Sequence, residues 1–118
     1  LCTLSQPQAF PAGTTFGVCA PDPENAQGFL YYVAVETNPL APSDYPVITT
    51  EPGLWAIFSA VGKPSEAIPP VFKYVNAEFF ASSEFDPRSE APELEVYSDA
   101  PMDENYITEV WFPVKRKV

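Results

Sequence analysis

Histidine is absent from this chain of 118 residues, and basic residues are scarce. Without histidine the chain cannot build a His-based catalytic triad, a haem ligand or a zinc site of the usual kind. The six lysines and arginines all follow residue 60 and stand against sixteen acids, which gives a net charge of −10. Because phosphate binding needs a basic surface, we expect no direct nucleic-acid contact by this domain. The negative net charge either serves to keep the protein soluble or, as a functional alternative, attracts cationic ligands.

Long apolar runs are also lacking. No stretch approaches the roughly 20 residues that cross a membrane, and no charged-then-apolar leader opens the sequence. The two cysteines, Cys2 and Cys19, do not have metal-ligand spacing. We therefore expect reduced thiols in a cytoplasmic protein, with no metal and no cofactor. A hydrophobic content of 46% is enough for one compact domain with its own core.

Hydrophobic periodicity predicts an α+β fold. Period-two runs predict strands at 14–20, 29–36, 47–50, 54–61, 93–97 and 106–114. Residues 64–82 have apolar side chains at helical spacing. Pro69 and Pro70 place the start of this helix near them, because proline is tolerated only in a first turn. Residues 1–13 and 83–92 are expected to be irregular, the first with one helical turn at most.

The last predicted strand carries one unusual residue, Glu109. Side chains alternate along a strand, so Glu109 shares a face with Ile107 and Trp111. A carboxylate among apolar neighbours loses water, and such a group neutralises or finds a partner. Glu109 is therefore either a rim carboxylate that still touches water or a pocket carboxylate that meets a cation. The spacing leaves both alternatives open.

The first half of the chain has the pattern of a partial copy of the second. Residues 14–36 parallel residues 93–114 as strand, acidic loop and strand, and Tyr32 then falls at the position of Glu109. The match is in pattern more than in identity, so chance is the alternative.

Four segments of the second half are informative in their order and spacing: GLWAIFSAVG at 53–62, NAEFFASS at 76–83, LEVY at 94–97 and TEVWFPVK at 108–115. In these segments the second half resembles the GyrI-like small-molecule-binding domain, which serves as the effector-binding part of AraC-type and MerR-type multidrug regulators. The resemblance covers residues 14–115 and implies two βαββ units facing each other across a groove, with a helix packed on an antiparallel sheet. We expect a single domain over 1–118, with a partial first unit at 14–46 and a second unit at 47–118.

This sequence departs from the family at its start. Residues 1–13 are too few and too rich in proline to supply the strand and helix of a first unit. Either upstream residues supply them, or half of the groove is built differently. Because unpaired edges and uncovered apolar faces promote association, we expect a homo-oligomer.

The resemblance implies that a glutamate of the last strand lies at the bottom of an aromatic pocket for cationic, lipophilic compounds. By motif position that residue is Glu109. Aromatic faces add cation–π attraction of roughly 0.5–2 kcal/mol each, with core packing as the alternative role. The aromatic candidates are Trp55, Trp111, Tyr97, Tyr32, Phe72 and Tyr74. Glu95 shares a strand face with Glu93 and Tyr97, a position more typical of a rim residue.

The function expected from this resemblance is a bacterial binding module for small cationic or amphiphilic organic molecules. The module would be free-standing or the sensor part of a transcription regulator. One alternative is a hydrolase of cyclopropane-containing compounds, in which Glu109 with Tyr97 or Tyr32 does acid–base work on a water. Another alternative is an acidic protein–protein inhibitor of the gyrase-inhibitor type.

Overall fold

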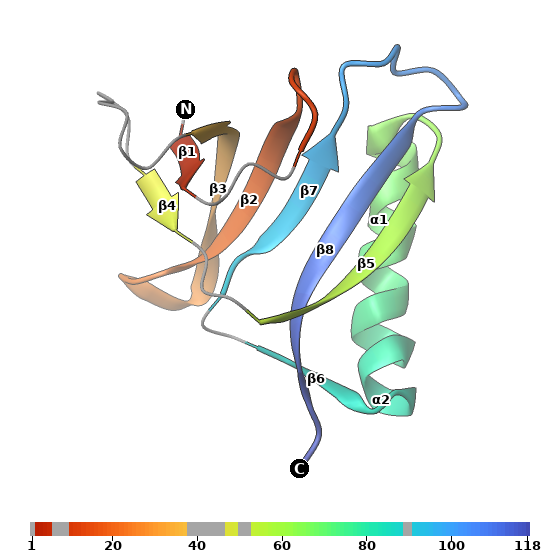
Figure 1. Ribbon diagram of the computed structural model, residues 1–118. Helices are drawn as coiled ribbons and strands as arrows, with labels where there is room; N and C mark the ends of the chain where they lie inside the picture. Colours follow the sequence, from red (N-terminus) through yellow and green to blue (C-terminus); the bar gives the residue numbers. More distant parts are fainter. Residues whose placement is uncertain (1, 6–9, 38–46, 50–52, 89–90) are drawn as a thin grey trace.

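The computed structural model describes residues 2–5, 10–37, 47–49, 53–88 and 91–118. Eight strands form one sheet, and one helix packs against it (Figure 1). The strands are β1 (Cys2–Ser5), β2 (Thr15–Asp22), β3 (Asn25–Thr37), β4 (Val47–Thr49), β5 (Leu54–Val61), β6 (Phe85–Pro87), β7 (Glu93–Tyr97) and β8 (Ile107–Arg116). The helix consists of three consecutive segments, α1 (Pro64–Tyr74), η1 (Val75–Phe79) and α2 (Phe80–Ser82). The predicted α+β class is confirmed.

Most of the sheet is antiparallel, in the strand order β4-β1-β3-β2-β7-β8-β5 with β6 beside β8. β1 is the exception, because it pairs parallel with both β3 and β4. Two expectations were wrong. Residues 2–5 form a strand where irregular chain was predicted, and residues 85–87 form a strand inside a predicted loop. Both strands are short and pair with segments distant in sequence, so no local pattern marks them.

The helix confirms the predicted helical segment but begins earlier than predicted. Pro64 lies in the first turn, where the missing N–H of a proline has no intrahelical partner to lose. Pro69 and Pro70 lie inside α1 and each removes one backbone hydrogen bond. The helix nevertheless continues, because its inner face, including the fully buried Val75, packs against β5 and β8. Tertiary burial here outweighs the local preference against proline.

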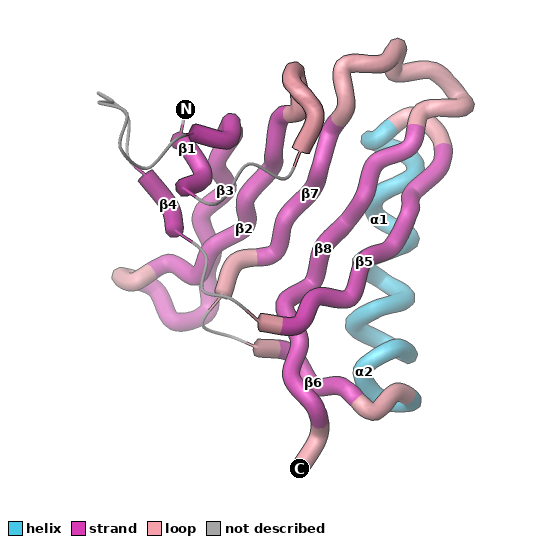
Figure 2. The backbone as a smooth tube through the Cα atoms, viewed as in Figure 1, coloured by secondary structure: helices cyan, strands magenta, loops and turns pink. Residues whose placement is uncertain are grey.

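The helix covers only half of the sheet. It lies behind β5 and β8, and in the described part of the chain no helix covers β2 and β3 (Figure 2). β1 ends at Ser5 and β2 begins at Thr15, so the link between them is too short for a comparable helix. On the uncovered half, Phe29 is 69% exposed and Val33 is 55% exposed. Self-association through this face stays a prediction.

Each face of the sheet has its own core. The helix-side core contains Ala60, Ile68, Val75, Val110, Phe112 and Val114. The core of the opposite face contains Phe16, Val18, Ala34, Leu94 and Val96, with Phe10, Tyr32, Ile48, Trp55 and Trp111 packed against them. Side chains alternate along β8. Val110 and Phe112 therefore point to the helix, while Glu109 and Trp111 point to the opposite face.

The hairpin β2–β3 repeats the hairpin β7–β8 in register. Val18 pairs with Tyr32 in the first hairpin, and Val96 pairs with Glu109 in the second. The two hairpins meet where β2 pairs with β7, and at the centre of that contact Gly17 lies opposite Glu95. Within this repeat, Gly17 is the counterpart of Glu95.

Candidate ligand-binding site

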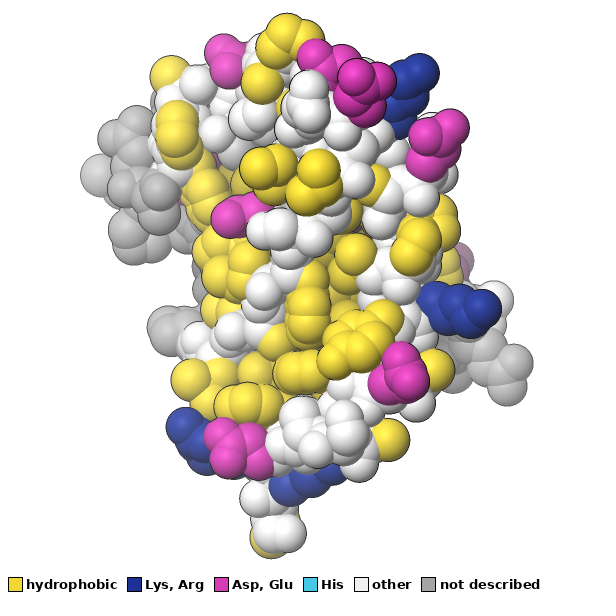
Figure 3. All heavy atoms as spheres, turned by 90° about the vertical axis from the view of Figure 1, so that its right-hand side faces the viewer, with side chains coloured by type: hydrophobic (Ala, Val, Ile, Leu, Met, Phe, Trp, Pro, Cys, Tyr) yellow, Lys and Arg dark blue, Asp and Glu magenta, His cyan; other side chains and the backbone are white. Residues whose placement is uncertain are grey.

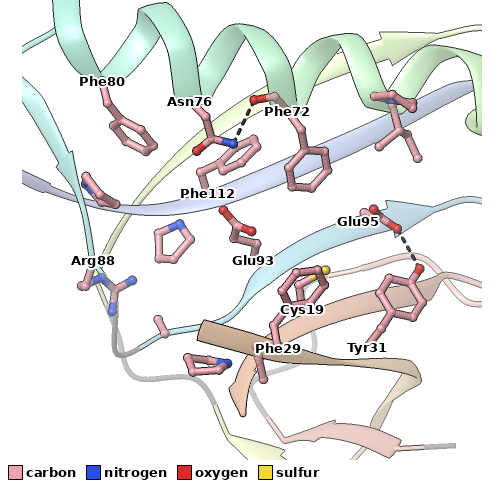
Figure 4. A pocket seen from close by; sticks show the side chains of 18 residues that line it. Cys19, Phe29, Tyr31, Phe72, Asn76, Phe80, Arg88, Glu93, Glu95 and Phe112 are labelled. Carbon is pink, nitrogen blue, oxygen red and sulfur yellow. Dashed lines mark hydrogen bonds between the residues drawn. The ribbon is translucent and has the colours of Figure 1, made fainter. Parts of the chain in front are cut away.

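A cavity of about 750 Å³ lies between the helix and the half of the sheet that the helix leaves uncovered (Figure 4). This volume is within the range of roughly 300–1,000 Å³ that is usual for small-molecule sites. Most of the wall is apolar. Its apolar residues include Ile68, Pro69, Phe72 and Phe80 from the helix, Phe112 and Pro113 from β8, and Phe29 from β3. A hydrophobic organic molecule matches such a wall.

The surface around the helix continues this apolar character. Figure 3 shows a band of hydrophobic side chains running down one face of the molecule, with charged side chains mainly at its margins. Exposed aromatic side chains at the cavity, such as Phe29, make part of its wall accessible from solvent. A ligand of moderate size can therefore reach the cavity without a rearrangement of the core.

Glu95 is the most deeply buried carboxylate of the cavity, with 9% of its surface exposed. Its Oε1 accepts two hydrogen bonds, one from the Tyr31 hydroxyl and one from the Tyr97 hydroxyl, each at 2.7 Å. Both bonds end on the same oxygen. The other carboxylate oxygen accepts no hydrogen bond from the described part of the chain. A buried carboxylate with one free oxygen is a ready partner for a cation.

Gly17 makes room for this arrangement. A Cβ atom at residue 17 would lie 2.6 Å from Glu95 Oε1 and in collision with the Tyr31 hydroxyl. Any side chain there would displace one of the two groups. The hydrogen bond between β3 and β7 therefore crosses over β2 at the one position where β2 has no side chain.

The two phenols stay protonated and act as donors. Burial and the hydrogen bond to Glu95 raise the pKa of Tyr31 to about 12. The same two causes raise the pKa of Tyr97 well above its ordinary value. Since neither phenol ionises near neutral pH, both hold Glu95 in one orientation.

A second carboxylate and a thiol lie beside Glu95. Glu93 is half-buried, and its pKa is raised by burial and by the nearby charge of Glu95. Cys19 pairs with Glu93 across β2 and β7. Burial, followed by the charges of Glu95 and Glu93, raises the pKa of the Cys19 thiol to about 11. The thiol is therefore protonated at neutral pH and is a poor nucleophile.

Two of the predicted aromatic residues lie at the site. Phe72 lines the cavity, and Tyr97 donates to Glu95. Tyr97 also lines a smaller recess of about 330 Å³, which shares Tyr31 and Glu95 with the larger cavity. Tyr74 is exposed and packs its ring against Phe58, outside both cavities.

The other four predicted site residues lie on the opposite face of the sheet. Trp55 and Trp111 contact each other at 5.9 Å between ring centroids, and Tyr32 packs in the same core. Glu109 Oε1 accepts a hydrogen bond of 3.1 Å from Trp111 Nε1. Side chains alternate along β8, and the helix covers the face that carries Val110 and Phe112. Glu109 therefore points away from the cavity. Its ligand-binding role stays a prediction.

Sequence reasoning missed the polar centre of the cavity. Glu95 was interpreted as a rim residue, and its burial shows that interpretation to be wrong. A usable signal was present, since Glu93, Glu95 and Tyr97 alternate on one face of a strand. Tyr31 and Gly17 gave no such signal, because their relation to Glu95 depends on pairing between strands distant in sequence.

Two further findings limit the chemistry of the described segments. No group of three or more His, Cys, Asp or Glu side chains in these segments is arranged to hold a metal ion. Among the described residues, no helix is both long enough and apolar enough to cross a bilayer.

The sequence model of the GyrI-like small molecule binding domain matches residues 1–115, and the chain belongs to this family. Among solved structures, SAV2435 bound to tetraphenylphosphonium is 30% identical with a TM-score of 0.71, over 86% of this chain and 61% of that one. A Staphylococcus aureus MU50 protein, provisionally described as a bacterial transcription regulation protein, is 26% identical with a TM-score of 0.66. That match covers 88% of this chain and 64% of the other. No curated protein matches the chain.

The comparisons confirm that this is a small-molecule-binding domain of the GyrI-like family. They give no support to the hydrolase alternative or to the protein-inhibitor alternative. The chain spans less than two thirds of the length of both related structures, 61% and 64%.

Proposed function

We propose that the cavity binds a lipophilic organic cation and that Glu95 is the carboxylate that meets its charge. The observation that carries this proposal is the Glu95 carboxylate, which is 9% exposed, lines the apolar cavity and has a second oxygen that accepts no hydrogen bond from the described residues. Burying an uncompensated charge is costly. A desolvated cation beside that oxygen offsets the cost, and the apolar wall buries the rest of the ligand.

The aromatic residues of the wall add to this preference. Phe72 lines the cavity from the helix, and its ring packs edge-on against the fully buried Phe112 of β8. A cation within about 6 Å of an aromatic face gains roughly 0.5–2 kcal/mol, and more when water is excluded. The tetraphenylphosphonium bound to SAV2435 is a large hydrophobic cation of this kind.

The biological role we propose is that of an effector sensor. The domain binds the cation either as a free-standing protein or as part of a longer transcription regulator. The similarity to a protein described in terms of bacterial transcription regulation supports this role. In either case the domain supplies ligand recognition and makes no direct contact with nucleic acid, in line with its charge of −10.

The test is a calorimetric titration with tetraphenylphosphonium of the unmodified chain and of two variants, Glu95→Gln and Glu109→Gln. Each variant keeps the shape of its side chain and removes the charge. Loss of a desolvated ion pair costs roughly 2–4 kcal/mol, or about 30- to 1000-fold in affinity. We expect this loss for Glu95→Gln and unchanged affinity for Glu109→Gln.

The two variants control for each other, because both glutamates accept a hydrogen bond from an aromatic side chain. A loss confined to Glu109→Gln would contradict the proposal and support the role predicted for Glu109 from its motif position. Failure of the unmodified chain to bind any lipophilic cation would contradict both.

A further inference from the structure

The cavity has a second charged end. Arg88 lines it from the segment after β6, and Figure 4 shows Arg88 and Glu95 at opposite ends with Glu93 between them. Arg88 is 9% exposed, and it is the one base among the buried residues of the described segments. A guanidinium does not lose its proton in a protein, so this end of the cavity is permanently positive.

The described residues give the Arg88 guanidinium few partners. Its Nη2 donates one long hydrogen bond of 3.5 Å to the backbone oxygen of Leu54, and its Nε has no hydrogen-bond partner. The guanidinium carbon lies 5.4 Å from the ring centroid of Trp55. Within the described segments no carboxylate forms an ion pair with Arg88. A buried charge with so few partners is costly unless something else compensates it.

The chain holds the guanidinium in place from one side. A Cβ atom at Gly53 would lie 2.6 Å from the guanidinium carbon of Arg88 and 2.8 Å from Nη2. The absence of a side chain at residue 53 thus lets the guanidinium rest against the backbone before β5, with the Trp55 ring beside it. The backbone at Gly53 and the Trp55 ring together position the Arg88 guanidinium, but neither of them carries a negative charge.

We propose that Arg88 is an anion subsite and that the ligand of this cavity is amphoteric, with a hydrophobic body, a cationic group and a carboxylate. This inference rests on the proposed function, since it places the cation at Glu95. The carboxylate then receives charge-assisted hydrogen bonds from Arg88, which are the strong kind and which suit the planar guanidinium. One molecule satisfies both buried charges at once.

The probes are carboxyalkyl-triphenylphosphonium ions of increasing spacer length, each compared with its methyl ester. Acid and ester share the phosphonium cation and the spacer, and at the far end the ester has a neutral methyl ester in place of the carboxylate. The net charge of −10 on the protein favours the ester by long-range attraction. A preference for the acid therefore reports a local contact.

For the best spacer we expect the unmodified chain to bind the acid about tenfold more tightly than the ester. Arg88→Gln should abolish this preference, so that the ratio of acid affinity to ester affinity falls to one or below. Arg116→Gln is the matched control, because Arg116 is an exposed arginine paired with Glu84, and it should keep the preference. Equal binding of acid and ester by the unmodified chain, at every spacer length, would overturn the inference.

The unmodified chain decides the question even if Arg88→Gln fails to fold, since the comparison of acid with ester needs no variant. Arg88→Lys keeps the positive charge without the planar fork, and it should retain only part of the preference. The two proposals fail in different ways. If tetraphenylphosphonium and the esters bind but the acids bind no better, the anion subsite is wrong and the proposed function stands. If no phosphonium ion binds, both are wrong.

Discussion

Both faces of the sheet hold a glutamate among aromatic side chains, but the two carboxylates have different surroundings. On the helix side, Glu95 accepts hydrogen bonds from Tyr31 and Tyr97 and lines a cavity of about 750 Å³. On the opposite face, Glu109 accepts one from Trp111 and lines neither of the cavities described above. A carboxylate beside aromatic rings therefore occurs on both faces of the described sheet. Of the two, Glu95 is the one that lines the cavities described above.

The cause of this difference is the uneven cover of the sheet. The helix packs on β5 and β8 and leaves β2 and β3 open, so its edge forms one wall of the cavity and the sheet forms the other. On the opposite face, aromatic side chains pack against one another, as Phe10 does against Phe16 and Trp111. On the helix side aromatic rings also pack in pairs, as Phe72 does against Phe112, but Phe29 and Phe72 border the cavity as well.

The largest expected effect is a difference in stability and ligand affinity between alanine variants of two neighbouring residues on β8. Phe112 is fully buried at the helix side and lines the cavity, whereas Trp111 is half-buried on the opposite face. Phe112→Ala should lower the free energy of unfolding by about 3–5 kcal/mol and weaken tetraphenylphosphonium binding. Trp111→Ala should destabilise less and leave binding unchanged. Urea denaturation and calorimetry measure the two quantities, and weaker binding by Trp111→Ala would place the ligand on the opposite face.

Gly17→Ala tests whether the helix-side carboxylate needs its present geometry. The added methyl would collide with the Tyr31 hydroxyl and crowd Glu95. We expect a loss of about 1–3 kcal/mol in the free energy of unfolding, and weaker cation binding. The same two measurements apply. A variant as stable as the parent, with the parent's affinity, would show that the bond between Tyr31 and Glu95 is dispensable.

Removal of a single hydroxyl should have a smaller effect. Tyr31→Phe or Tyr97→Phe deletes one donor to Glu95, which is worth about 0.5–1.5 kcal/mol, or up to about tenfold in cation affinity. Tyr32→Phe is the matched control, because Tyr32 follows Tyr31 in the chain and packs on the opposite face. Calorimetry measures the cation affinity of each variant. An equal loss of affinity in Tyr31→Phe and Tyr32→Phe would contradict the placement of the ligand on the helix side of the sheet.

The smallest expected effect concerns pH. The pKa of Glu93 in the folded chain is raised above its ordinary value of 4.5, first by burial and then by Glu95. A carboxyl with a raised folded-state pKa binds protons more tightly in the folded state. Its contribution to stability is therefore complete below pH 4.5 and is lost as the pH rises through the raised pKa. Glu93→Gln should remove this decline in urea denaturation measured across the pH range. If Glu93→Gln keeps the same dependence of stability on pH as the unmodified chain, the raised pKa assigned to Glu93 is wrong.

Much of the architecture follows from local patterns. Alternation predicted the long strands, and helical spacing predicted the helix despite Pro69 and Pro70. The short strands β1 and β6 escaped prediction, because their pairing depends on partners far along the chain. Of the predicted site residues, Phe72 and Tyr97 lie at the site.

The sequence by itself determined the family, the α+β class and the two alternating sets of side chains on each strand. It could not determine which set meets the cavity, because both faces of β8 are largely apolar and period two is the same whichever face is covered. The tertiary structure decided this when the helix packed on the face of Phe112 and left Glu109 on the other. Strand pairing then brought Gly17 opposite Glu95, and the chain after β6 brought Arg88 to the far end of the cavity. These are contacts between distant residues, which local patterns in a sequence do not encode.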